Sequence, residues 1–155
     1  MHTRTAFVDD IELADEWLMS GQMIIRPEQT GLSTARRRIR DIAKRLDLNQ
    51  DETENLLLAF GEALSNAYRY GCPDHESNLI QVSWYVEDGS IAVIVRDDGA
   101  GFDVSHSESS SRRTNNSLGC GICLMRASVD EVNFDFEEGE KVTLKKYLPV
   151  NRLPI

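Results

Sequence analysis

The chain has 155 residues and a mass of 17.5 kDa, the size of one domain with its own core. Its net charge of −9 at pH 7 argues against broad binding to nucleic acid, because neutralising phosphates needs basic surface. No apolar run approaches the roughly 20 residues of a membrane span, and the acidic start lacks the apolar centre of a signal peptide. The default expectation is one cytoplasmic domain with neither nucleic acid nor membrane as a partner.

The first third of the chain predicts a weakly ordered start, a strand and a helix. Residues 1–20 have little periodicity and are expected to be an extension, with a short helix or a disordered tail as the alternatives. The segment MIIRPE favours a short strand that stops before Pro27. Apolar residues spaced by three and four from Leu32 to Leu46 then predict a helix, with Ser33 as its N-cap.

A second helix is predicted over residues 49–71. Asn49 stands three residues before Glu52, as in a capping box, and the pattern after it is strongly apolar. Gly71, followed by Cys72 and Pro73, is a helix stop signal.

Two hairpins and a third helix are predicted in the second half. The β-rich runs 79–86 and 90–96 flank the turn signal EDGS, and the runs 131–136 and 141–148 flank EEGE. Between them lie a long polar loop, residues 103–117, and a helix over 118–129. The order β-α-α-β-β-loop-α-β-β implies an α+β sandwich. We expect residues 21–150 to form the domain and residues 151–155 to be a C-terminal tail.

The cysteines suggest a metal or redox site. Cys120 and Cys123 form C-x-x-C, and Cys72 and His75 also have ligand spacing, so together they could hold zinc. The alternative is that small buried cysteines pack like other apolar residues. Packing is favoured because Cys120 is flanked by glycines at a helix start, and a redox motif would follow a strand directly.

A polar pair interrupts the apolar second helix. Glu62 and Asn66 are four residues apart, so they lie on one helical face. An asparagine oxygen can complete the shell of Mg²⁺ beside substrate phosphates, and a carboxylate can deprotonate a nucleophile. The alternative is a solvated polar stripe, which the pair alone would favour.

A second motif follows the strand VIVRD. Asp97 at the strand end could accept a hydrogen bond from the exocyclic amine of adenine, and Gly99 and Gly101 would let the backbone approach a flat base. A surface turn is the alternative.

A third motif, SLGCGICLM, opens the last helix. Gly119 and Gly121 would leave backbone amides free to point at an anion, assisted by the helix dipole. Arg112 and Arg113 in the preceding loop are candidates for phosphate contacts. Like the others, this motif is weak alone.

The order of the three motifs carries a resemblance. A helix with E-x-x-x-N, then D-x-G-x-G after a strand, then a long polar loop and G-x-G at a helix resembles the ATP-binding fold of gyrase-type ATPases, Hsp90, histidine kinases and MutL. From about residue 23 to 148, the chain most resembles the small bacterial anti-sigma-factor serine kinases. That family implies a two-layer Bergerat-type fold with a mixed, mostly antiparallel sheet and helices on one face.

The resemblance also implies roles for individual residues. Glu62 would be the general base, Asn66 the Mg²⁺ ligand and Asp97 the adenine reader, and residues 103–117 would form the ATP lid. It implies that Gly99 and Gly101 shape the adenine pocket and that Gly119 and Gly121 line the phosphates. The further candidates for nucleotide contacts are Phe102, Arg112, Arg113 and Ile122. The chain departs from the family at Tyr70, where many relatives have His, and at Glu140, where a small Ser or Thr commonly follows the glycine.

The function implied is an ATP- and Mg²⁺-dependent protein serine/threonine kinase. In the family, a form that is usually a homodimer holds a sigma factor of RNA polymerase inactive and phosphorylates a serine on a small STAS-type antagonist. The alternatives are a nucleotide-binding interaction module without kinase activity and the catalytic half of a histidine kinase. The latter needs a helical segment with a phosphoacceptor histidine before residue 33, which the sequence lacks.

Overall fold

A computed structural model describes residues 5–7, 19–72, 77–98, 117–137 and 139–149. Five strands and three helices follow one another in the predicted order, preceded by one additional strand. The elements are β1 (Thr5–Phe7), β2 (Ser20–Ile25), α2 (Gln29–Arg45), α3 (Gln50–Tyr70), β3 (Ile80–Glu87), β4 (Ser90–Asp97), α5 (Ser117–Ser128), β5 (Glu131–Asp135) and β6 (Lys141–Tyr147).

The strands form one sheet in the order β1-β2-β3-β4-β6-β5. All neighbouring pairs are antiparallel except β1 and β2, which are parallel. The predicted hairpin joins β3 to β4 through Asp88 and Gly89, which both have positive φ (52° and 76°) as a tight two-residue turn requires. The sheet is mixed and mostly antiparallel, as the family resemblance implied.

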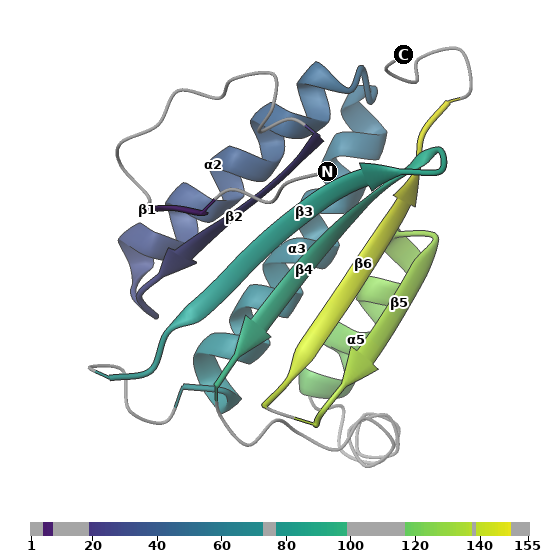
Figure 1. Ribbon diagram of the computed structural model, residues 1–155. Coiled ribbons are helices and arrows are strands. Elements are labelled where there is room, and N and C mark those ends of the chain that lie inside the picture. The colour runs from purple at the N-terminus through teal and green to yellow at the C-terminus, as the bar shows by residue number, and fades with distance from the viewer. Residues whose placement is uncertain (1–4, 8–18, 73–76, 99–116, 138, 150–155) are drawn as a thin grey trace.

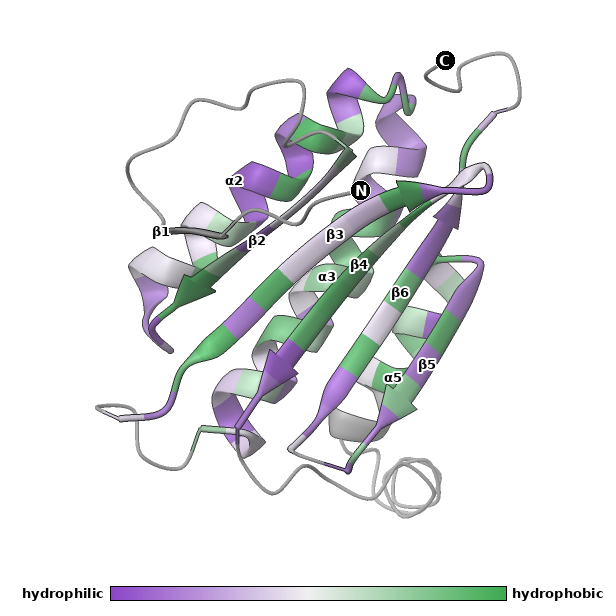
Figure 2. Ribbon diagram, viewed as in Figure 1, coloured by the Kyte–Doolittle hydropathy of each residue, from purple (hydrophilic) through white to green (hydrophobic). Residues whose placement is uncertain are grey.

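The three helices lie together on one face of the sheet (Figure 1). Alternate residues of β3 are buried against them, as expected for a sheet with one covered face. The central strand β4 is hydrophobic along most of its length and becomes hydrophilic at its C-terminal end (Figure 2). That polar strand end lies beside the end of α3, where Gly71 packs against Asp97.

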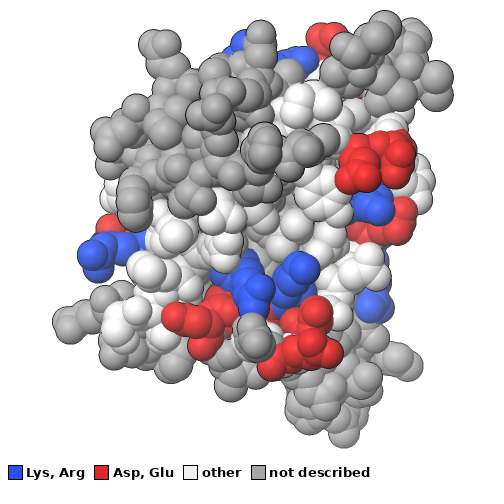
Figure 3. All heavy atoms as spheres, in the orientation of Figure 1, with Lys and Arg blue, Asp and Glu red and all other residues white. Residues whose placement is uncertain are grey.

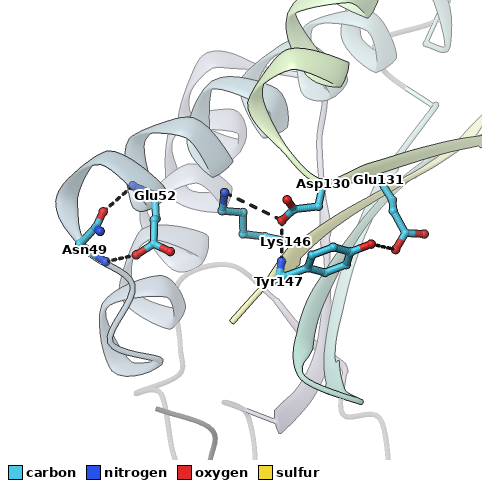
Figure 4. Close-up of polar contacts among 6 residues, drawn as sticks. All are labelled: Asn49, Glu52, Asp130, Glu131, Lys146 and Tyr147. Atoms are coloured by element: carbon cyan, nitrogen blue, oxygen red, sulfur yellow. Dashed lines mark hydrogen bonds and ion pairs between the residues drawn. The ribbon is translucent and has the colours of Figure 1, made fainter. Parts of the chain in front are cut away.

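Local signals fix the start of α3. The Asn49 side chain accepts a hydrogen bond from the Glu52 amide at 2.8 Å, and the Glu52 side chain accepts one from the Asn49 amide at 2.9 Å (Figure 4). The predicted capping box is thus confirmed. The helix runs to Tyr70, and the Gly71 amide caps it by donating to Ala67.

The start of α2 differs from the prediction. The helix begins at Gln29, Glu28 is its N-cap without a side-chain bond, and Ser33 is an exposed residue inside the helix. The prediction of Ser33 as the N-cap was wrong because the turn after β2 already starts the helix. Gly31 packs so closely there that a Cβ would lie 2.6 Å from the Arg26 carbonyl oxygen.

The far edge of the sheet is held by polar contacts between β6 and the start of β5. The Tyr147 hydroxyl donates to Glu131 at 2.6 Å, and the Tyr147 amide donates to Asp130 at 2.7 Å (Figure 4). Lys146 lies 3.9 Å from the same Asp130 oxygen. These contacts are remote from the polar end of β4, and they connect the last two strands at the edge of the sheet.

The face of the sheet away from the helices carries charges of both signs. Lys and Arg side chains lie next to Asp and Glu side chains near its lower edge (Figure 3). Arg96, Lys141, Asp135 and Glu137 surround one shallow hollow there. The described part of this face is therefore not a single-sign basic surface of the kind that binds phosphate backbones.

Candidate nucleotide site

The central helix α3 places Glu62 and Asn66 one turn apart. Asn66 is 2% exposed, although α3 buries mostly apolar residues around it. Its amide nitrogen has no hydrogen-bond partner within the described residues. A buried polar group without a partner is rare and points to a missing ligand or water. Asn66 is therefore not part of a solvated stripe.

Helix α5 packs against α3 and brings Gly121 to Glu62. A Cβ atom at Gly121 would lie 2.6 Å from the Glu62 Oε2 atom, closer than carbon and oxygen can approach. Two motifs that are distant in the sequence thus meet in space. The glycine leaves room for the carboxylate between the two helices.

The two glycines of the third motif have different positions in α5. Gly119 is the third residue of the helix, within the first turn, whose amides have no acceptor in the described part of α5. Gly121 is the fifth residue, so its amide falls beyond that set, contrary to the expectation that both amides are free. Its observed role is the close approach to Glu62.

Asp97 ends β4 with a buried carboxylate, 3% exposed. Its amide donates to the Glu140 carbonyl at 3.0 Å, and its Oδ1 accepts from the Glu140 amide at 3.3 Å. On its other side the carboxylate touches Gly71 at the end of α3, where an added Cβ would overlap it. Asp97 therefore has a fixed position between the end of α3 and the segment that precedes β6.

The environment of Asp97 disfavours further negative charge. Burial and then Asp97 raise the pKa of Glu140 to about 8. Burial, followed by Asp97 and Asp98, raises the pKa of the Cys72 thiol to about 11. Near neutral pH, the neutral forms of the Glu140 carboxyl group and the Cys72 thiol are therefore favoured.

The structure does not place every predicted residue. Ile122 is fully buried in the hydrophobic core, and its contact with a nucleotide stays a prediction. The other predicted contacts lie outside the described residues: Gly99, Gly101, Phe102, Arg112 and Arg113.

The cysteines do not come together as a described metal site. Cys72 is buried after α3, whereas Cys123 is exposed on α5. Within the described part of the chain, no three His, Cys, Asp or Glu side chains could hold a metal ion. His75 lies outside that part, as does the side chain of Cys120.

Sequence reasoning missed the positions of three residues at this end of the sheet. The sequence indicates Gly71 only as a helix stop, and Cys72 only as a possible metal ligand or core residue. Glu140 was noticed because a carboxylate replaces the usual small hydroxyl residue, but its burial beside Asp97 follows only from the pairing of β4 and β6.

Comparison with known proteins decides the family. The model of the histidine kinase-like ATPase domain matches residues 25–146, most of the chain. The chain belongs to this ATPase family. An anti-sigma F factor from Geobacillus kaustophilus is 30% identical over 122 residues, which cover 75% of this chain and 84% of that protein. This confirms the resemblance to anti-sigma-factor kinases within the superfamily.

Other relatives agree with this assignment. The serine-protein kinase RsbW of Bacillus subtilis is 28% identical over 136 residues, covering 83% of this chain and 84% of that protein. Among solved structures, the RsbU and RsbW domains of a Mycobacterium tuberculosis protein match with a TM-score of 0.60 at 19% identity, which supports the fold. That match covers 82% of this chain but only 32% of the longer mycobacterial chain.

The described residues suit the ligand that an ATPase family implies. Asn66 offers an oxygen of the type that Mg²⁺ prefers, on a buried side chain whose nitrogen lacks a partner. Gly121 leaves space around Glu62, and Asp97 is a fixed hydrogen-bond acceptor. The site can therefore be divided into a helix side (Glu62, Asn66 and Gly121) and a sheet end (Gly71, Asp97 and Glu140).

Proposed function

We propose that the protein is an ATP-dependent anti-sigma factor that sequesters a sigma factor and phosphorylates a serine or threonine on an anti-sigma-factor antagonist. The family match and the names of the relatives support this class of activity. The observation that carries the proposal is the contact between Glu62 on α3 and Gly121 on α5, one helical turn from the buried Asn66. A carboxylate and a cation ligand are thereby held at the start of a helix.

Each residue of the site has a proposed task. Bound Mg-ATP supplies the phosphoryl group for transfer. Asn66 would hold the Mg²⁺ ion through its side-chain oxygen. Glu62 orients the hydroxyl of the antagonist and accepts its proton, and Asp97 accepts a hydrogen bond from the adenine amine. The free amides of the first turn of α5, including that of Gly119, bind phosphate oxygens.

The partners follow from the same proposal. They are a sigma factor, a STAS-type antagonist and a second copy of this chain, in the cytoplasm. No described helix is long and apolar enough to cross a membrane. We also propose that Gly99, Gly101, Phe102, Ile122, Arg112 and Arg113 complete the nucleotide site.

A phosphotransfer assay tests the proposal. The protein is incubated with radiolabelled ATP, Mg²⁺ and a candidate antagonist, and a second sample contains the antagonist with its acceptor serine changed to alanine. We expect label on the first antagonist only, and we expect the protein to retain its sigma factor in pull-downs when ATP is present.

Two results would change the conclusion. Nucleotide binding and sigma retention without phosphotransfer to any candidate antagonist would make the protein a nucleotide-binding interaction module. Absence of nucleotide binding would contradict the proposed function altogether.

A further inference from the structure

Glu140 is a buried acidic residue at the sheet end that the proposed chemistry does not use. The last registered pair of β4 and β6 is Arg96 with Lys141, and Asp97 and Glu140 are the next pair along. The Asp97 amide donates to the Glu140 carbonyl at 3.0 Å, and the Glu140 amide donates to Asp97 Oδ1 at 3.3 Å. Val95 and Val142 are core residues, and each lies two residues from Asp97 or Glu140. Because residues two apart share a face of the sheet, both acidic side chains lie on the face that the helices cover.

The Glu140 carboxyl group has no partner within the described part of the chain. The residue is 2% exposed, and neither of its carboxyl oxygens accepts or donates a hydrogen bond there. Burying an ionised carboxylate without a partner is strongly unfavourable, so such a group becomes protonated or awaits a ligand. The large majority of buried side-chain polar atoms in native proteins are paired, so this position needs an explanation.

The groups around Glu140 favour its protonated form. Asp97 faces it from β4 and raises its pKa, in addition to the larger effect of burial. Cys72, which follows α3, lies near Asp97 and Asp98, and burial together with these two residues raises the pKa of its thiol. The thiol is therefore neutral at neutral pH. With a pKa of about 8, the Glu140 carboxyl group carries a proton at neutral pH and can donate a hydrogen bond.

The geometry points to Glu140 as a second reader of the nucleobase: we propose that its carboxylic acid donates a hydrogen bond to adenine N1 while Asp97 accepts one from the adjacent exocyclic amine. This inference rests on the proposed function, because it assumes that the site binds an adenine nucleotide. A carboxylic acid next to a carboxylate presents one donor and one acceptor. The Watson–Crick edge of adenine presents the complementary acceptor and donor.

The arrangement also discriminates between bases. Hypoxanthine and guanine carry a carbonyl where adenine carries its amine, and a hydrogen on N1. Their carbonyl would face the Asp97 carboxylate, and their N1 hydrogen would face the Glu140 proton. Glu140 is thus a specificity-determining residue, and the specificity depends on its proton.

The test is the pH dependence of ADP affinity at constant Mg²⁺, measured by titration calorimetry between pH 6.5 and 9. For the wild-type protein, we expect ADP to bind about tenfold more weakly at pH 9 than at pH 7, because ionisation of Glu140 removes the donor. The matched variant is Glu140→Gln, whose amide donates at every pH. We expect its ADP affinity to stay constant over this range.

A second measurement needs no substitution in the protein. The analogue 1-deaza-ADP keeps the exocyclic amine but has a C–H group in place of N1. We expect the wild-type protein to bind it about fivefold to tenfold more weakly than ADP at pH 7, the effect of one hydrogen bond, and without the pH dependence above pH 8.

The outcomes separate this inference from the proposed function. If ADP binds but its pH profile is the same for the wild type and Glu140→Gln, or the same as that of 1-deaza-ADP, Glu140 does not read the base and only this inference is overturned. If the wild type binds no ADP at any pH, the proposed function is overturned together with it.

Discussion

The helix side and the sheet end of the site hold their polar groups by different physical means. On the helix side, Glu62 and Asn66 are positioned by the repeat of α3, and the absence of a side chain at Gly121 leaves room for the Glu62 carboxylate. At the sheet end, Asp97 and Glu140 are two acidic side chains placed together by strand pairing, so the proton of one depends on the charge of the other.

Because of this difference, the helix side and the sheet end can be distinguished by experiment. On the helix side, an added methyl group at Gly121 would displace the end of the Glu62 side chain, which the proposed chemistry uses. The sheet end depends on shape at Gly71 but also on protonation at Glu140. Phosphotransfer chemistry should therefore respond to changes on the helix side, whereas base recognition and its pH dependence should respond to changes at the sheet end.

The largest expected effect is on the helix side, in Glu62→Gln. The amide fills the same space beside Gly121 but cannot accept the hydroxyl proton. We expect the rate of phosphotransfer to fall about 10²- to 10⁴-fold, the usual contribution of a general base, while the ADP dissociation constant is unchanged. Single-turnover transfer from labelled ATP, together with ADP calorimetry, measures both quantities. A wild-type transfer rate in this variant would remove Glu62 from the chemistry.

The next effect concerns the shape of the sheet end. In Gly71→Ala the new methyl group would overlap the Asp97 carboxylate and displace it, although the backbone of Gly71 (φ −93°, ψ −8°) suits alanine. Overpacking of this kind costs about 1–3 kcal/mol, so ADP should bind roughly tenfold to a hundredfold more weakly.

The chain offers a matched control for that variant in the same helix. At Gly61 an added Cβ would meet only the end of the flexible Arg36 side chain. Gly61→Ala should therefore keep the ADP affinity of the wild type. Equal losses in the two alanine variants would show that the Asp97 contact is not the cause.

Protonation of Glu140 at the sheet end should also make the free energy of unfolding depend on pH. The pKa of Glu140 is about 8 in the folded protein and near 4.5 when unfolded. Between these values the folded state binds more protons, so the free energy of unfolding should fall as the pH rises from about 4.5 to 8.

Glu140→Gln removes this pH dependence of the free energy of unfolding, because an amide does not titrate in this range. We expect the variant to be more stable than the wild type at pH 8 by at least about 1 kcal/mol, since one pKa unit corresponds to about 1.4 kcal/mol. Urea unfolding at pH 5, 6.5 and 8 measures the difference. A gap between the two proteins that does not grow with pH would contradict the buried, protonated state of Glu140.

The smallest effect lies outside both halves of the site. Asn49→Ala removes the capping box of α3 and should cost about 1 kcal/mol of stability. Because the capped end of α3 is opposite to Gly71, we expect ADP affinity to remain that of the wild type at a temperature where the variant is folded. A parallel loss of affinity would mean that the site depends on the helix start.

The sequence predicted those parts of the fold that local chemistry determines. Asn49 and Glu52 form their capping box within one turn, and the turn at Asp88 and Gly89 requires only residues that tolerate positive φ. The start of α2 could not be predicted in the same way, because it depends on packing of Gly31 against the preceding turn. Strand β1 has three residues and exists through its pairing with β2.

The candidate site also combines residues that could be predicted from local sequence with contacts that depend on tertiary packing. Residue type and order were sufficient to nominate Glu62, Asn66 and Asp97. The contact of Gly71 with Asp97 and the burial of Glu140 could not be predicted, because they depend on where α3 ends relative to β4 and on the register of β4 with β6.

The central claim is that the helix side and the sheet end form one Mg²⁺-dependent nucleotide site. A calorimetric titration with ADP, with and without Mg²⁺, on the wild type and on Asn66→Ala tests it most directly. We predict that Mg²⁺ tightens ADP binding to the wild type and that this gain disappears in Asn66→Ala. The same Mg²⁺-dependent affinity in both proteins, or no ADP binding by the wild type, would contradict the claim.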